Sequence, residues 1–389
     1  MLIMRRIITV CTIISLLVVI SCNDNKISDL SIEKHSLDDC KEGTIEDLFS
    51  DVELIELRFD DKYYPKAISR MFIESGMVFV HDNRNNIYIY TEDGTPISSS
   101  LKMRGEGPGE HPFVMGFSWN PHSQLAEIIT PYLLMFYDKN FNFVKSTRLE
   151  SRVGKDSKKG MMYRTIYDLS SDLHLMAPTG ASERPWRLIV YDSSKEKNIG
   201  EISYEEDLWS SINIQSNHFF VLPDSTIYCH PQGLLPYTYI LDPENLTMDK
   251  AIEIESGSRC ITLDDIKKLS GDEIQIAHYL HDYEKPIPVN TIVTSDKLFV
   301  MLKRGNTIRG FSTVVFDRNS SEKKEYSHYK NGKFMFPKID FVKDNYVYAI
   351  VSKDALQENP ALYLNNLANI SNIDSFDEEN WILLKYKYN

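Results

Sequence analysis

Residues 104–111, with the sequence RGEGPGEH, combine four ionisable side chains with three glycines and a proline. Glycine permits positive φ and close approach of the backbone to a ligand, so this loop can present Arg104, Glu106, Glu110 and His111 to a bound molecule. The alternative, which we favour, is a structural loop in which Arg104 pairs with a carboxylate. Neither a helix nor a Lys-Ser/Thr pair follows the glycines, which argues against a phosphate-binding loop.

Histidine pairs are the next candidates for chemistry. His278 and His281 lie three residues apart, with Asp282 beside them, on a predicted helix, and this spacing can place two metal ligands on one face. The sequence offers no third ligand for this pair, so solvent-exposed histidines are the favoured interpretation. No Gly-x-Ser-x-Gly, His-Glu-x-x-His or EF-hand motif is present, and the sequence therefore predicts no catalytic residue.

Several aromatic side chains can provide flat platforms for sugars. They are Tyr63, Tyr64, Trp119, Trp186 and Trp209. Packing in the core is the commoner use of such residues. The content of 22 tyrosines suits a chain rich in β-strands.

The N-terminus indicates the cellular compartment. Arg5 and Arg6 precede an apolar run over residues 7–20, which is too short to span a membrane stably. The run ends in Ser21 and Cys22, a pattern that resembles the lipobox of bacterial lipoproteins. It predicts a signal peptide over 1–21, a lipid on Cys22 and a flexible tether over 22–45. An ordinary signal peptide is the alternative.

Charge and cysteine content exclude some functions. The formal net charge of -13 argues against nucleic acid as a partner. After removal of the signal and lipidation of Cys22, the cysteines left are Cys40, Cys229 and Cys260. A Cys229–Cys260 disulfide is one interpretation, and buried free thiols are the favoured one.

Short alternating strands dominate from about residue 51, and one strand type recurs. It is apolar or aromatic, ends near an acidic residue in most copies, and occurs six times, at 87–90, 134–138, 188–192, 239–242, 314–317 and 382–386. The first intervals are close to the ~50 residues of a four-stranded propeller blade. The two longer intervals contain insertions, a predicted helical one at 262–285 and an Asn-rich one at 354–379 with a helix near 360–367.

The strand count predicts an all-β fold, a six-bladed β-propeller over residues 46–389. The last blade, expected at 334–341, 346–351 and 381–388, lacks a fourth strand, while the segment 52–59 precedes the first blade without a blade of its own. Ring closure by this N-terminal strand removes two open sheet edges. A β-sandwich or two smaller β domains are the competing architectures.

The chain resembles the Bacteroidetes six-bladed β-propeller lipoproteins, which are related to NHL and TolB-like propellers. The resemblance rests on the lipobox, the opening strand at 52–57, the Asp93-Gly94 turn, the segment 104–110 and the closing strand at 381–388. It spans nearly the whole chain and is weak in blades 3 to 5, and the insertion at 262–285 departs from it. It implies the fold and a cell-envelope location but no settled activity.

These observations favour a non-enzymatic binding or interaction module, anchored by lipid to the outer membrane and facing the periplasm or the cell surface. The expected ligand is an unknown protein or carbohydrate, and no cofactor is expected. Hydrolase or lyase chemistry with a divalent metal on the propeller axis is the alternative, because propeller enzymes assemble sites from several blades. A scaffold in a protein complex is a third hypothesis.

Overall fold

The structure is a computed structural model that describes most of the chain. The described residues are 31–59, 64–149, 162–179, 187–203, 218–231, 236–262, 264–265, 285–305, 310–330, 333–334, 336–358 and 370–389. Contacts divide the chain into two compact units, residues 1–33 and 34–389, and the first is described only from residue 31. The account below concerns the second unit.

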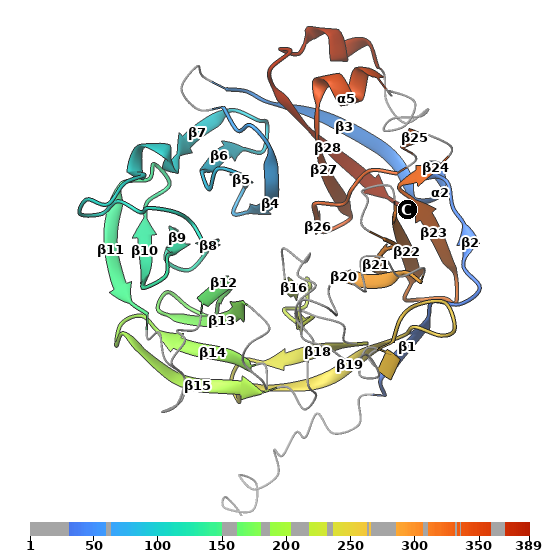
Figure 1. Cartoon of the computed structure of the whole chain (residues 1–389), viewed down its shortest axis with the longest axis horizontal. Helices are drawn as coiled ribbons and strands as arrows, with labels where there is room; N and C mark the ends of the chain where they lie inside the picture. Colours follow the sequence, from blue (N-terminus) through green and yellow to red (C-terminus); the bar gives the residue numbers. More distant parts are fainter. Residues whose placement is uncertain are drawn as a thin grey trace, which may run out of the picture. The chain divides into compact units, whose positions relative to one another are not determined.

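Residues 34–389 form a ring of six β-sheets, the blades of a β-propeller (Figure 1), which confirms the predicted fold. Within each blade neighbouring strands are antiparallel, and in blades 1 and 2 short turns join them, as alternating short strands predict. Blades 1 and 2 comprise β4 (Ile68–Glu74), β5 (Met77–Asp82), β6 (Ile87–Thr91) and β7 (Pro96–Ser99), then β8 (Gly116–Asn120), β9 (Leu125–Ile129), β10 (Leu133–Tyr137) and β11 (Phe143–Arg148).

The next three blades follow the same order from the axis outward. Blade 3 comprises β12 (Met162–Asp168), β13 (Leu173–Thr179), β14 (Arg187–Asp192) and β15 (Lys197–Ser203). Blade 4 comprises β16 (Phe219–Val221), β17 (Ile227–Cys229), β18 (Tyr237–Asp242) and β19 (Thr247–Glu255). Blade 5 comprises β20 (Ile287–Val293), β21 (Lys297–Lys303), β22 (Phe311–Asp317) and β23 (Lys323–Ser327). The recurring strand of the sequence is the third strand in every blade.

Blade 6 joins the two ends of the propeller. Its strands are β26 (Phe341–Lys343), β27 (Tyr346–Ser352), β28 (Trp381–Tyr388) and, outermost, β3 (Phe49–Leu57) from the N-terminal part of the chain. β28 and β3 pair along nearly their whole length, with Leu384 opposite Leu54, which confirms the predicted ring closure. The inner strand differs from the expected 334–341, because β25 (Lys333–Phe334) pairs with β24 (Tyr329–Lys330) in a separate hairpin.

The segment before β3, residues 34–48, lies along the outer edges of blades 4 and 5, and we call it the N-terminal strap. It contains most of β1 (Glu33–Ser36), β2 (Lys41–Glu42) and α2 (Ile45–Leu48). β1 pairs with β19 and β2 runs parallel to β23. Leu37 of the strap is fully buried. The flexible tether predicted over 22–45 therefore differs from the structure at its described end, where the chain covers two edges; residues 22–30 lie outside the described residues.

The core lies between the blades, because alternate side chains of one strand face opposite neighbours. Along β9, Ala126 and Ile128 pack against blade 1, while Ile129 packs against blade 3. We call the contact between blades 1 and 2 the first seam and that between blades 2 and 3 the second seam. Full burial of apolar side chains on both faces of each blade makes the ring one packed body.

Two insertions interrupt the ring. Thr262 and Asp265 exchange reciprocal hydrogen bonds, Asp265 N to Thr262 Oγ1 at 3.1 Å and Thr262 N to Asp265 Oδ2 at 3.0 Å, so a helix begins where Thr262 was expected to cap it. The rest of the predicted helix, residues 266–284, lies outside the described residues, as does the helix predicted near 360–367. The second insertion contains α5 (Lys353–Glu358) and η3 (Ile370–Ser375).

The cysteines agree with the favoured interpretation. Cys229 and Cys260 are buried free thiols, and Cys40 is a partly buried free thiol. Within the described residues, no helix is long and apolar enough to cross a membrane.

Candidate functional site

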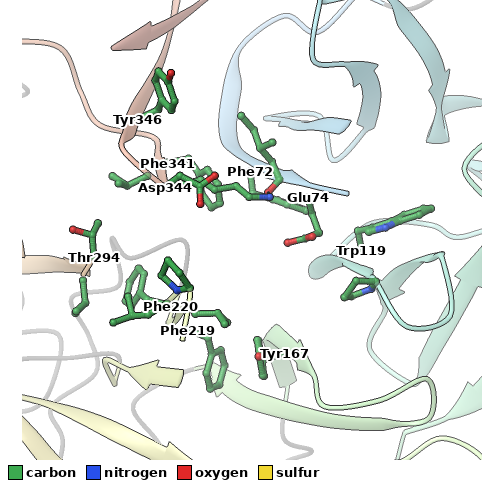
Figure 2. Close-up of a pocket in the computed structure, with 18 of the residues that line it drawn as sticks. Phe72, Glu74, Trp119, Tyr167, Phe219, Phe220, Thr294, Phe341, Asp344 and Tyr346 are labelled. Atoms are coloured by element: carbon green, nitrogen blue, oxygen red, sulfur yellow. The ribbon is translucent and has the colours of Figure 1, made fainter. Parts of the chain in front are cut away.

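A cavity of about 840 Å³ opens along the axis of the ring, where the innermost strands of the blades converge. Its wall contains the ends of β4, β8 and β12 and the turns that follow β16, β20 and β26. Every blade therefore contributes to it, and Figure 2 shows side chains of the wall arranged around an open centre. Its volume falls within the range of small-molecule sites, ~300–1,000 Å³.

Aromatic side chains make up much of the wall. They come from blades 1 to 4 and from blade 6, and they are Phe72, Phe117, Trp119, Tyr167, Phe219, Phe220, Phe341, Tyr346 and Tyr388. Two pairs of them are in contact: Tyr167 stacks on Phe219 with ring centroids 5.0 Å apart, and Phe72 lies tilted against Phe117 at 5.4 Å. Five of these rings are buried in the core between blades, so the aromatic surface left for a ligand is that of the partly exposed rings, which are Phe72, Tyr167, Phe341 and Tyr346. Contact with buried neighbours preorganises such a surface.

The charged side chains of the wall balance one another. Arg70, Lys343 and Lys387 are cationic, and Glu74, Asp168 and Asp344 are acidic. A balanced wall creates no strong net field for a highly charged ligand.

Arg70 is the most unusual of these charges. Arg70 is half-buried in the cavity wall, and desolvation of its guanidinium lowers its pKa to about 10. The guanidinium carbon lies 5.6 Å from the centre of the Phe72 ring, and among the described residues no carboxylate forms an ion pair with it. It is therefore available as a donor to a polar group in the cavity.

Asp168 connects the cavity to a buried ionisable cluster in the second seam. His174 Nδ1 lies 2.7 Å from Asp168 Oδ1 and 3.3 Å from Glu127 Oε2. The His174 and Glu127 side chains are fully buried, and that of Asp168 is 3% exposed. Three groups that ligate metals therefore meet within 4.8 Å of one another at the wall of the cavity.

The strand pattern explains how the cluster forms. Glu127 faces blade 3 from the same side of β9 as Ile129, and His174 faces blade 2 from the same side of β13 as Met176. Asp168 ends β12 directly opposite His174 in the strand register. Ionisable residues thus occupy strand positions that face a neighbouring blade, where the alternation of the strand would place apolar residues.

Burial changes the pKa of two members of the cluster. Desolvation, together with the nearby Asp168 carboxylate, raises the pKa of Glu127 to about 7. The carboxylates of Asp168 and Glu127 outweigh the desolvation of His174 and raise its pKa to about 9. A carboxylate nearby is a like charge for Glu127 and an opposite charge for protonated His174, and in a seam without water both effects raise the pKa.

The cluster also bears on the hypothesis of a divalent metal on the propeller axis. Of its three groups only Asp168 belongs to the cavity wall, so the cluster lies beside the axis within the second seam. It is the only such group that the described residues contain.

The four residues singled out at 104–111 lie elsewhere. They lie between blades 1 and 2, in the segment after β7 on the outside of the ring (Figure 1), and none of them lines the cavity. Arg104 and Glu106 are exposed, whereas His111 is 1% exposed. The loop does not bring its charges to a common centre.

Contacts within this loop involve Glu110 and His111, whereas the expected ion pair of Arg104 with a carboxylate is absent from the described residues. Glu110 Oε2 accepts a hydrogen bond from the backbone N of Gly107 at 2.9 Å. The Tyr137 hydroxyl donates to the carbonyl of Gly109 at 3.1 Å and lies 3.3 Å from His111 Nδ1. Desolvation and the Arg104 charge lower the pKa of His111 to about 4.

Other predicted candidates divide between the cavity and the rest of the chain. Trp119 lines the cavity, and Tyr64 is exposed and does not. Tyr63, Trp186, Trp209, His278, His281 and Asp282 lie outside the described residues, as does Cys22.

Sequence reasoning missed the cluster and most of the cavity wall. A usable signal existed for the cluster, since Glu127 and His174 interrupt otherwise apolar strands. For the wall, the signal was an aromatic residue near the end of the inner strands of blades 1 to 4, as Tyr167 and Phe220 show. Neither signal identifies a site until the strand register and the order of the blades show which side chains meet.

Comparisons with known proteins agree with this architecture. The family model DUF5128, described as a 6-bladed beta-propeller, matches residues 23–349. An exported protein of Bacteroides fragilis has a similar structure, with a TM-score of 0.68 and 14% identity, covering 92% of this chain and 100% of that one. A DUF4221 family member from Bacteroides vulgatus has a TM-score of 0.55 and 14% identity, covering 87% of this chain and 99% of the other. No curated protein matches the chain.

Proposed function

Because the chain belongs to the DUF5128 family of six-bladed β-propellers and its own ring has a ligand-sized axial cavity, we propose that it is a cell-envelope binding protein. In this proposal the cavity takes up a neutral oligosaccharide. The observation that carries the proposal is the ring of aromatic side chains around the cavity. The C–H face of a sugar packs on such rings, while its hydroxyl groups need hydrogen bonds from a few polar groups at the edge.

The charges of the wall support an uncharged ligand. Three cationic side chains (Arg70, Lys343, Lys387) and three acidic ones (Glu74, Asp168, Asp344) leave no excess of either sign. Arg70, without an ion-pair partner in the described part of the chain, supplies donors for a hydroxyl oxygen. A protein partner would need a broad surface, whereas the aromatic groups are gathered in a concave site.

Tyr167→Ala tests this assignment. Loss of one stacking platform should weaken binding of neutral starch-, xylan- or mannan-derived oligosaccharides about tenfold, as measured by calorimetry on the purified protein. Tyr132→Ala is the matched control, because Tyr132 is 68% exposed and does not line the cavity. Equal loss in both variants, or wild-type affinity in Tyr167→Ala, would contradict the proposal. Loss of binding in Arg104→Ala alone would move the site to the loop at 104–111.

We further propose that the mature chain is an outer-membrane lipoprotein, anchored through a lipid on Cys22. The support is the apolar run before Ser21 and Cys22, and the exported character of a structurally similar protein agrees with it. Cys22→Ala should abolish labelling of cells with a radioactive fatty acid and move the protein from the membrane to the soluble fraction. Protease added to intact cells distinguishes a surface location from a periplasmic one.

Hydrolase or lyase activity is the second candidate function. The specific observation that favours it is the Glu127–Asp168–His174 cluster, which contacts the cavity through Asp168. This candidate predicts that bound oligosaccharides are shortened over time and that a chelator stops the reaction. Intact oligosaccharide after prolonged incubation with divalent metal would exclude it for those substrates.

A further inference from the structure

We propose that Glu127, Asp168 and His174 form a binding site for one divalent transition-metal ion, of the class of Zn²⁺, in the second seam beside the axial cavity. This inference does not depend on the oligosaccharide proposal, because the site lies in the seam and its test uses a metal ion alone. It rests on the geometry of the three side chains, on a buried carboxylate oxygen that has an ion pair with His174 but no hydrogen-bond donor among the described residues, and on the groups that orient the ligands.

Geometry shows that hydrogen bonds alone do not satisfy the cluster. His174 Nδ1 faces both carboxylates, at 2.7 Å from Asp168 Oδ1 and 3.3 Å from Glu127 Oε2. A single ring nitrogen offers one hydrogen or one lone pair, so it can serve only one carboxylate. Glu127 Oε2 is fully buried and accepts no hydrogen bond from any described group. A cation between the three atoms gives each of them a partner.

The seam orients Glu127 toward this centre. Asn120 Oδ1 accepts hydrogen bonds from the backbone N of His122 and of Ser123, at 2.9 and 3.1 Å. The amide NH2 of Asn120 is thereby turned to Glu127 Oε1, to which it donates at 2.9 Å. With Oε1 held in this way, Oε2 points to His174. Such groups behind the ligands fix their orientation in metal sites.

The second carboxylate is held similarly and provides access. The Ser118 hydroxyl donates to Asp168 Oδ2 at 3.3 Å, which leaves Oδ1 directed at His174. Asp168 and Ser118 both line the axial cavity. An ion can therefore reach the seam from the cavity, and the cavity can supply water as a further ligand.

The chemical type of the three ligating atoms indicates which metal ion the site would prefer. Two carboxylate oxygens and one imidazole nitrogen suit Zn²⁺ and its neighbours, whereas Mg²⁺ and Ca²⁺ prefer oxygen ligands only. A divalent ion would replace the positive charge that protonated His174 supplies to the two carboxylates in its absence, with release of the His174 proton. Charge balance matters because the cluster is buried among apolar residues, where uncompensated charge is costly.

Zinc binding to the purified, chelator-treated protein tests the proposal. Calorimetry and elemental analysis should give one Zn²⁺ per chain, and Zn²⁺ should raise the midpoint of thermal unfolding. Co²⁺ should bind in competition with Zn²⁺ and give the visible absorption of a mixed nitrogen and oxygen site. Mg²⁺ should bind at least about 100-fold more weakly than Zn²⁺.

Glu127→Gln is the decisive variant, because it removes a ligand charge and keeps the shape of the side chain. The metal-free variant should fold like the wild type, and its Zn²⁺ affinity should fall more than about 100-fold, beyond the loss caused by groups behind the ligands. Glu106→Gln, in an exposed loop, is the matched control and should bind Zn²⁺ like the wild type.

Three results would overturn the assignment. They are absence of stoichiometric Zn²⁺ binding to the wild type, wild-type affinity in folded Glu127→Gln, and tighter binding of Mg²⁺ than of Zn²⁺. In each case the cluster would be a hydrogen-bonded charge network within the seam.

Discussion

Two successive seams of the propeller bury a histidine in opposite electrostatic surroundings. In the first seam, His111 lies against the Tyr137 hydroxyl, and burial lowers its pKa to about 4. In the second seam, His174 lies between Glu127 and Asp168, and its pKa rises to about 9. The same residue type thus joins one pair of blades as a neutral hydrogen-bonding group and the next as part of a charged centre.

The two seams differ in how far hydrogen bonds within the fold satisfy their buried ionisable groups. In the first seam, Glu110 accepts a hydrogen bond from the Gly107 backbone and His111 lies beside the Tyr137 hydroxyl, so two of the four ionisable side chains at 104–111 have partners within the fold. In the second seam, hydrogen bonds leave Glu127 Oε2 without a donor among the described residues. Buried charge of this kind is costly unless it gains a partner, and for that reason we assign a ligand to the second seam and none to the first.

Asn120→Ala should have the largest effect, because Asn120 is fully buried and organises the second seam. The variant removes hydrogen bonds to Glu127, to the Ser170 carbonyl and to two backbone N–H groups. We expect the free energy of unfolding to fall by about 4 kcal/mol, measured by urea denaturation. The exposed Asn140→Ala is the control, and similar losses in the two variants would contradict the role of Asn120.

Gly109→Ala tests the first seam. Gly109 has φ +78, and an added Cβ would lie 2.8 Å from Phe143 Cγ. Backbone strain and overpacking together should lower the free energy of unfolding by about 3 kcal/mol. Gly76→Ala shares the positive φ, at +73, but meets nothing within 4 Å, so it isolates the strain component and should cost less. Equal costs would mean that contact with Phe143 is unimportant.

Acid and alkali should affect the two seams with opposite sign. The folded pKa of His111, about 4, lies below its ordinary value of 6.5, so its contribution is present above pH 6.5 and is lost as pH falls toward 4. The folded pKa values of His174 and Glu127, about 9 and about 7, lie above their ordinary values. Their contributions are present at low pH and are lost as pH rises through those values.

Urea unfolding of the metal-free protein between pH 5 and pH 9 measures this difference. Relative to the wild type, His111→Gln should reduce the loss of stability between pH 7.5 and pH 5 by about 2 kcal/mol. Glu127→Gln should instead remove a loss of stability that occurs as pH rises from 4.5 to about 7, so its effect on the slope of stability against pH is opposite to that of His111→Gln. The comparison of seams fails if both variants change the slope of stability against pH in the same direction.

Tyr137→Phe should have the smallest effect of the set. It removes the hydroxyl that donates to the Gly109 carbonyl and lies beside His111 Nδ1, and it keeps the ring in the core. A loss of about 1 kcal/mol in the free energy of unfolding is expected. Zn²⁺ binding by this variant should equal that of the wild type, and any loss of affinity would mean that the two seams are coupled.

The architecture was largely predictable because its signals are local. Strand alternation and turn residues repeat along the chain, and the unmatched strand at 52–59 together with the incomplete last blade implied closure. The covering of blades 4 and 5 by the strap could not be predicted, because a segment that contains Leu37 among polar residues carries too weak a pattern.

The candidate sites were much less predictable. The loop at 104–111 attracted attention because its charges are adjacent in sequence, and the structure places it in a seam. Glu127 and His174, far apart in sequence, went unnoticed because each is a single polar residue in an apolar strand.

The sequence by itself determined the all-β class, the six-fold repeat, the closing strand and a lipobox-like N-terminus, since each depends on residue types within a few dozen positions. Only the tertiary structure decided which strand faces meet. Glu127, Asp168 and His174 come from three strands of two blades, and the cavity wall comes from all six blades. The physical reason is that a blade seam joins residues through register and twist, which no local pattern specifies.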